Sequence, residues 1–201
     1  MNDVAPILRN GVATGRPRGR HVLIIGGGAS GVMMAAHLLA RTDAAFCVTI
    51  VEGRHMLGCG VAYSTTDPDH LLNTRAHNMS AWPDRPHHFI DWLRDRPEGE
   101  GVTEQCFVGR ATYGTYLAGL LDRWSGQGQD RQLRCVRRTC LRLRETANGV
   151  AATLDDGQTL IGDMAVLATG HAQPATEPAG ALTSPWSRTE PVDADARIAI
   201  V

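Results

Sequence analysis

A run of glycines between two apolar segments constrains this chain more than any other feature. His21–Ile25 is short, apolar and rich in β-branched residues, which predicts a buried parallel strand. Val32–Ala40 repeats apolar residues at helical spacing. Between them, Gly26-Gly27-Gly28-Ala29-Ser30-Gly31 fits the pattern G-x-G-x-x-G. A strand, a glycine turn and a helix in this order indicate a dinucleotide-binding βαβ unit.

The spacing of the three key glycines has a physical explanation. Gly26 permits a tight turn, Gly28 lets the backbone approach a pyrophosphate, and Gly31 allows the helix to pack closely on the strand. The N-terminus of the helix then offers free N–H groups and a positive dipole end to the phosphates. A second apolar strand, Phe46–Val51, ends on Glu52, where a carboxylate can accept hydrogen bonds from ribose hydroxyls.

The acid at the end of the second strand also narrows the choice of nucleotide. Glu52 would repel a 2′-phosphate, which disfavours NADP at this site and leaves FAD and NAD open. The alternative is a purely structural glycine turn in an α/β core. We favour the dinucleotide site because the strand, the helix and the acid all agree with it.

Composition excludes several classes of protein. The chain has 201 residues, of which 43% are hydrophobic, and a net charge of −1. Nothing here favours a nucleic-acid or membrane partner, and no apolar run reaches the roughly 20 residues of a membrane span. No apolar core follows the basic residues near the N-terminus, so no secretory signal is expected. Five cysteines without metal-ligand or C-x-x-C spacing favour reduced thiols in a cytoplasmic protein and no metal site.

The order of the segments predicts the domain organisation. Residues 1–20 read as a flexible leader, and residues 21–170 as the dinucleotide-binding domain, with an antiparallel β-meander inserted at about 133–161. Short helices are expected at Pro68–Leu72 (capped by Asp67), His87–Asp95 and Thr112–Ser125. A buried strand over 163–170 ends in Ala-Thr-Gly. Residues 171–201 form a connector and the first strand of a second, truncated dinucleotide-binding unit, so we expect a piece of a longer protein.

Further motifs resemble those of a known family. The chain is similar to the two-dinucleotide-domain flavoproteins of the glutathione-reductase-like class. More narrowly, it resembles the FAD-NAD(P)-binding family of bacterial flavoproteins typified by YdhS. The motifs that carry this narrower resemblance are Gly58-x-Gly60-Val61-Ala62-Tyr63-Ser64, His70-Leu71-Leu72-Asn73, Phe89-x-x-Trp92-Leu93, Arg110-x-x-Tyr113-Gly114-x-Tyr116-Leu117 and Leu167-Ala168-Thr169-Gly170-His171. One departure is a link between the first helix and the second strand that is a few residues longer than the minimal fingerprint.

The resemblance implies a Rossmann-like FAD/NAD(P)-binding fold with FAD in this domain. It places the pyrophosphate at the glycine turn, a ribose at Glu52, and the flavin near Gly60, Asn73 and the Ala-Thr-Gly strand end. The adenine would lie against the backbone at Cys140. The candidate cofactor-binding residues are Gly26, Gly28, Ala29, Ser30, Gly31, Glu52, Gly53, Gly60, Asn73, Cys140, Ala168, Thr169 and Gly170.

By this resemblance the chain is the FAD-binding domain of an oxidoreductase. NADH or NADPH would reduce the flavin from a site mostly outside the chain, and the acceptor is oxygen in a monooxygenation or another electron carrier. No residue stands out as catalytic: His70, His77 and His171 follow no order, and Cys59 lacks a partner cysteine for thiol redox chemistry. The alternatives are a non-catalytic dinucleotide-binding module, such as a redox sensor or docking domain, and an NAD-only dehydrogenase.

Overall fold

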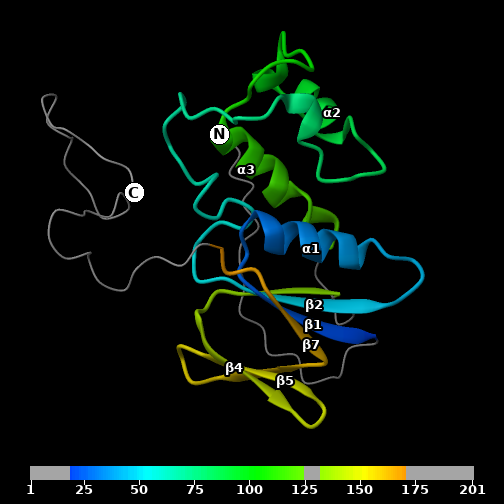
Figure 1. Cartoon of the computed structure of the whole chain (residues 1–201), viewed down its shortest axis with the longest axis vertical. Helices are drawn as coiled ribbons and strands as arrows, with labels where there is room; N and C mark the ends of the chain where they lie inside the picture. The colour runs from blue at the N-terminus through cyan, green and yellow to red at the C-terminus, as the bar shows by residue number, and fades with distance from the viewer. Residues whose placement is uncertain (1–18, 125–131, 171–201) are drawn as a thin grey trace, which may run out of the picture. The chain divides into compact units, whose positions relative to one another are not determined.

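The computed structural model of the protein describes residues 19–124 and 132–170. Within these ranges helix α1, a parallel sheet and an antiparallel sheet form three successive layers, and α3 packs against α1 (Figure 1). In chain order the elements are β1 (Arg20–Ile25), α1 (Ala29–Leu39), β2 (Phe46–Val51), η1 (Ala76–Asn78), α2 (His88–Arg94), η2 (Pro97–Gly99), α3 (Arg110–Gly119), η3 (Asp122–Trp124), β3 (Leu133–Val136), β4 (Cys140–Thr146), β5 (Gly149–Leu154), β6 (Thr159–Gly162) and β7 (Met164–Leu167).

The central sheet has the order β3-β2-β1-β7, and every neighbouring pair of strands is parallel. Val22 and Ile24 of β1 belong to the core shared with α1 and α3, whereas Leu23 and Ile25 belong to the core shared with the antiparallel sheet. Burial on both faces explains why β1 is apolar without a break. The predicted Rossmann-like α/β class with a central parallel sheet is confirmed.

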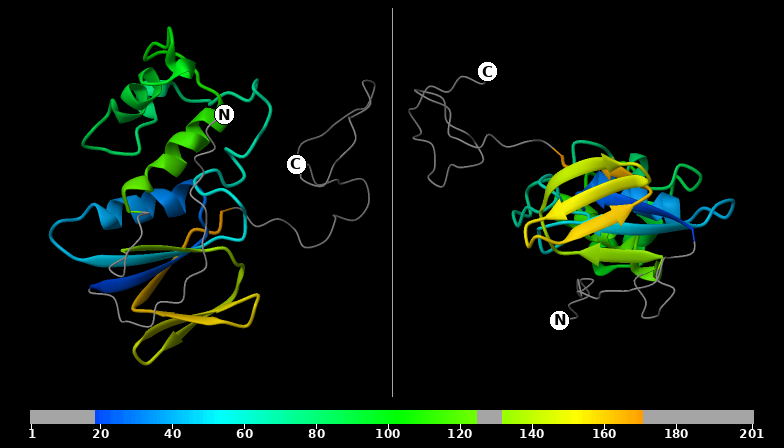
Figure 2. Two further views of the ribbon diagram at one scale, coloured as in Figure 1. Left: turned by 180° about the vertical axis from the view of Figure 1, so that it is seen from behind. Right: turned by 90° about the horizontal axis from the view of Figure 1, so that it is seen from below.

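The antiparallel sheet has the order β4-β5-β6 and packs on one face of the parallel sheet (Figure 2). Its existence confirms the predicted meander, but the predicted start at residue 133 is wrong. β3 pairs in parallel with β2, Leu133 lying opposite Val48, so the meander begins at Cys140. A four-residue strand is too short for side-chain periodicity to tell a parallel partner from an antiparallel one.

The helices differ from the sequence expectations mainly at their ends. α1 begins at Ala29, directly after the glycine turn, and α3 ends at Gly119, short of the predicted Ser125. Tyr113 and Tyr116 of α3 are 4% and 1% exposed, so they pack in the core as their helical spacing indicated. Among the described helices, none is long and apolar enough to cross a membrane.

Two predicted elements take another form. The helix at Pro68–Leu72 is absent: Asp67 accepts the N–H of Asp69 in a turn (2.9 Å), and Leu71 bridges to Gly109 instead. A proline suits a turn as well as a first helical turn, so pairing with a distant segment decides the outcome. The strand expected to be buried near residue 167 is β7, which pairs with β1 and leaves Leu167 66% exposed.

Some expectations fall beyond the described residues. Residues 1–18 of the predicted leader and the whole segment 171–201, with its connector and expected strand, lie outside them. Of the predicted leader, Arg20 is described and forms the first residue of β1.

Candidate functional site

The four parallel strands all end at one row of residues. Ile25 of β1 lies between Val51 of β2 and Leu167 of β7, and Val51 pairs with Val136 of β3. The segments that follow the four strands therefore lie together at one edge of the sheet. Ligands of open α/β sheets bind at the carboxyl ends of the strands, so this edge is the candidate site.

Gly26 turns the chain sharply at this edge. Its φ of 106° favours glycine, and a Cβ built on it would lie 2.2 Å from the carbonyl oxygen of Ala168. Its N–H donates to the carbonyl of Val51 (2.9 Å), while Ala168 donates its N–H to the carbonyl of Ile25 (2.8 Å). The turn after β1 is thus held by the last residue of β2 and by the residue that follows β7.

Gly31 lets helix α1 start directly against this turn. A Cβ at Gly31 would lie 2.0 Å from the carbonyl oxygen of Gly26, so no larger residue fits without a backbone shift. Gly28 precedes the helix in extended conformation without a side-chain cap, and Ala29 and Ser30 open the first turn. The N–H groups of a first helical turn lack intrahelical partners and attract anions.

Glu52 is fixed beside the glycine turn by its own carboxylate. Its Oε2 accepts the N–H of Gly27 at 2.8 Å, and its Oε1 accepts the N–H of Arg54 at 2.9 Å. Its backbone N–H donates to the carbonyl of Val136 (3.0 Å). Two bonds to a charged acceptor set the carboxylate's orientation, and its remaining lone pairs can receive ribose hydroxyls.

The loop after β2 closes over the glycine turn. Gly58 donates its N–H to the carbonyl of Gly27 (2.8 Å), and Leu57, 3% exposed, would block any side chain at Gly27. Gly60 faces Gly28 so closely that a Cβ on either would lie 3.4 Å from the other's Cα. Sequence reasoning missed the clamping role of Leu57 and Gly58, although their place soon after Glu52 was a usable signal.

Four of the remaining candidates have less direct links to the turn. A Cβ at Gly53 would lie 2.9 Å from Oγ1 of Thr139, so a contact within the protein already requires glycine there. Cys140 begins β4 next to Thr139. Gly170 has a φ of 70° with open space around it, and Thr169 is exposed beside it.

Asn73 lies on the segment whose neighbour Leu72 donates its N–H to Val108 (2.8 Å). Its side chain is exposed. Among the described contacts, none joins Asn73 to the glycine turn. Its predicted place near a flavin stays a prediction.

Acid–base and thiol candidates do not converge on the turn in the described residues. His70 bonds Oγ1 of Thr65 (2.8 Å), and His77 lies 2.9 Å from the carbonyl of Glu104. His171 lies outside the described residues. Cys59 is buried, which raises its pKa and disfavours the thiolate needed for redox exchange. In the part of the chain that the structure describes, no group of three His, Cys, Asp or Glu side chains is placed to hold a metal.

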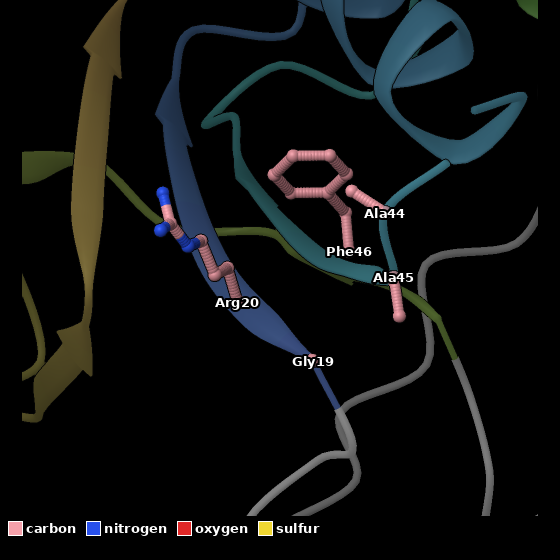
Figure 3. A pocket seen from close by; sticks show the side chains of 5 residues that line it. All are labelled: Gly19, Arg20, Ala44, Ala45 and Phe46. Atoms are coloured by element: carbon pink, nitrogen blue, oxygen red, sulfur yellow. The ribbon is translucent and has the colours of Figure 1, made fainter. Parts of the chain in front are cut away.

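A hollow of about 530 Å³ lies at the opposite edge of the sheet (Figure 3). It is lined by Gly19, Arg20 and the segment 44–46, where β1 and β2 begin. Binding sites of parallel sheets form at the carboxyl ends of the strands, where the turns carry phosphate-binding N–H groups. We therefore assign no function to this hollow.

Solved structures share this fold. A flavin-containing monooxygenase from Stenotrophomonas maltophilia is 19% identical, with a TM-score of 0.51 over 75% of this chain and 38% of its own. A closed form of cyclohexanone monooxygenase is 17% identical, with a TM-score of 0.54 over 81% of this chain and 28% of its own. OTEMO in complex with FAD and NADP is 17% identical, with a TM-score of 0.52 over 82% of this chain and 28% of its own. The chain thus spans well under half the length of these structures, and at such identities they show the fold alone.

Sequence comparison adds the family. Curated protein sequences give no match to the chain. The model of the FAD-NAD(P)-binding family matches residues 23–172, which contain the glycine turn, Glu52 and the strand end at Ala168. The geometry fits such a ligand, because Gly26 and Gly31 admit no Cβ and so keep the turn tight against the start of α1, and an acid stands at the ribose position. The chain therefore belongs to the FAD-NAD(P)-binding family.

Proposed function

We propose that the chain is the FAD-binding domain of an NAD(P)H-dependent flavoprotein oxidoreductase. The observation that carries the proposal is the row of strand ends, which brings the glycine turn, Glu52 and Ala168 to one edge. Because the Glu52 carboxylate would repel a 2′-phosphate, a dinucleotide without that phosphate suits this turn. NADH or NADPH would then bind outside the described residues.

Each candidate residue has a role in holding FAD. The first turn of α1, from Ala29 to Gly31, receives the pyrophosphate, and Gly28 and Gly60 give it a path free of side chains. Glu52 accepts a hydrogen bond from a ribose hydroxyl, and the backbone at Gly53 and the backbone at Cys140 flank the adenine. Ala168, Thr169, Gly170 and Asn73 complete the flavin side of the site. Bound FAD would supply the electron chemistry, and the protein positions it.

We further propose an oxygen-using, monooxygenase-like reaction in the cytoplasm, with a small-molecule substrate. The structural neighbours include a flavin-containing monooxygenase and cyclohexanone monooxygenase, which supports this class of reaction, and the glutathione-reductase-like, YdhS-like motifs of the sequence agree with it. Nucleic acid and membrane are not expected as partners, given the net charge of −1.

The test is FAD uptake followed by reduction. The longest available form of the chain is titrated with FAD in the dark, then mixed with NADH or NADPH while the flavin absorption bands are followed. Glu52→Gln keeps one acceptor oxygen but sets an NH₂ group against one of the two backbone N–H donors. Loss of a hydrogen bond to a charged group costs about 1.5–3 kcal/mol, so FAD affinity should fall at least about tenfold.

The outcomes separate this proposal from its alternatives. Glu145→Gln, on the exposed strand β4, is the matched control and should bind FAD like the natural chain. Bleaching by NADH or NADPH supports the oxidoreductase. FAD uptake without bleaching in a full-length protein favours a sensor or docking module. A protein that binds NAD and takes up no FAD would instead be an NAD-only dehydrogenase.

A further inference from the structure

All the tyrosines of this chain lie in one row, which starts in the loop just after Gly60. The chain has three. Tyr63 follows Gly60 closely in the sequence, and its N–H donates to the carbonyl of Cys59 (2.9 Å). The ring of Tyr63 meets that of Tyr113 edge-on with centroids 4.9 Å apart, and the ring of Tyr113 lies 5.6 Å from that of Tyr116.

The row ends on a phenol that has a base within hydrogen-bond distance. Tyr116 is 1% exposed, and its hydroxyl oxygen accepts the N–H of Ala81 (3.0 Å). The same hydroxyl lies 2.8 Å from Nδ1 of His88. With the proton of neutral His88 on Nε2, the phenol donates its own proton to Nδ1.

The surroundings of His88 keep it available as a proton acceptor. Burial is the main cause that lowers its pKa below 6.5, and Arg85 lowers it further. Asp91 and Asp84 act in the opposite direction, and the rings of Tyr116 and Trp82 that pack against it are uncharged. The imidazole is therefore neutral at pH 7.

A partly exposed tryptophan ring packs against Tyr116 at this end of the row. The ring of Trp92 lies 5.4 Å from that of Tyr116, and Cζ of Arg96 lies 3.9 Å from the centroid of the Trp92 ring. Tyrosine and tryptophan are among the side chains most easily oxidised by one electron. Rings at such spacing connect the cofactor site with the surface near α2.

We propose that Tyr116 and His88 form a one-electron redox site that serves the cofactor site through Tyr113 and Tyr63. An oxygen-derived radical released at the flavin takes one electron from the row, and the hole settles on Tyr116. The O–H bond of Tyr116 breaks, its proton bonds to Nδ1 of His88, and the oxidant is reduced by one electron. A cellular thiolate later returns one electron and becomes a thiyl radical, and His88 returns the proton to the oxygen of Tyr116. The role of this pair rests on the proposed flavin function, whereas its chemistry can be tested without FAD.

The experiment uses a photo-oxidant in solution. The chain is illuminated with a ruthenium polypyridyl complex and persulfate as electron acceptor, frozen, and examined by electron paramagnetic resonance. Because only three tyrosines exist, single Phe variants assign any tyrosyl radical. We expect the natural chain and Tyr63→Phe to give a tyrosyl radical and Tyr116→Phe to lose it.

His88→Asn is the second test variant. Asparagine can accept the hydrogen bond from the hydroxyl of Tyr116 but cannot take up its proton. Its tyrosyl signal should be lost while Tyr116 stays in place, which also covers the case that Tyr116→Phe fails to fold. In the natural chain the radical yield should fall once the pH drops below the lowered pKa of His88 and the imidazole is protonated. A radical that survives Tyr116→Phe, or one insensitive to both pH and His88→Asn, overturns the proposal. Because no FAD is present, failure of FAD uptake leaves this result readable.

Discussion

At the scale of single residues, the site depends on positions where nothing larger than hydrogen fits. Gly26 and Gly31 both face backbone oxygens at the place of a missing Cβ. The carboxylate of Glu52 then anchors the turn. One of its oxygens accepts the N–H of Gly27 in the turn, and the other accepts the N–H of Arg54 in the loop after β2. Two glycines without room for a side chain and one carboxylate therefore create the candidate dinucleotide site at the carboxyl ends of β1 and β2.

Gly31→Ala should destabilise the protein strongly. Its Cβ would lie 2.0 Å from the carbonyl oxygen of Gly26, and such overpacking costs about 1–3 kcal/mol. Gly119→Ala in α3 is the matched control, because its Cβ would have ordinary contact at 3.6 Å from Asp122 and alanine favours a helix by up to about 1 kcal/mol. Urea unfolding should show opposite signs, and equal effects would contradict this account of Gly31.

His21 predicts a dependence of stability on pH. It lies half-buried on β1, with Nε2 2.8 Å from Oγ1 of Thr49, and burial is the main cause that lowers its pKa. The unfolded chain therefore binds more protons as the pH falls below 6.5, so the free energy of unfolding decreases there. His21→Gln, which cannot be charged, should make the decrease between pH 7 and 5 shallower. Identical slopes in the two proteins would refute this.

At the scale of elements, the meander and the parallel sheet share a second core. Leu154 of β5 is 1% exposed and packs among Leu23, Val51 and Val136 of the parallel sheet. The other face of the same sheet packs against α1 and α3. Each strand of the parallel sheet thus depends on two different partners.

Leu154→Ala should weaken the attachment of the meander. Deleting a buried leucine side chain costs about 2–5 kcal/mol through lost transfer energy and a cavity. Leu141→Ala on β4, where the side chain is 68% exposed, should stay within about 0.5 kcal/mol of the natural chain. Urea unfolding gives both values, and amide exchange of β5 should accelerate only in Leu154→Ala.

At the scale of the whole molecule, the ligand and the fold are linked. The glycine turn, the Leu57–Gly60 loop and the strand end at Ala168 come from distant parts of the chain and hold one another through backbone hydrogen bonds. A ligand that binds only this assembly stabilises all of it.

FAD should therefore raise the unfolding temperature. At a free concentration of 100 times Kd, FAD adds about 2.7 kcal/mol to the free energy of unfolding, which for a domain of this size corresponds to several degrees. NADP at the same concentration should give a much smaller shift, because Glu52 repels its 2′-phosphate. An equal shift from both nucleotides would show that Glu52 does not select the ligand.

Local sequence determined the βαβ unit. The unbroken apolar run of β1, the glycine spacing and the acid after β2 each follow from short-range physics, because a strand buried on both faces, a tight turn and a helix start need those residues in that order.

Only the tertiary structure decided the rest. β3 belongs to the parallel sheet because it pairs with β2, which is distant in the sequence. Residues 68–72 form no helix because the backbone of residues 71 and 72 pairs with residues 108 and 109. Leu57 and Gly58 became part of the site by folding back onto Gly27. The row from Tyr63 to His88 is invisible in the sequence, where helical spacing indicates only a core. Short segments carry too little information to choose among distant partners, and that choice is made by the burial and hydrogen bonds that the assembled fold provides.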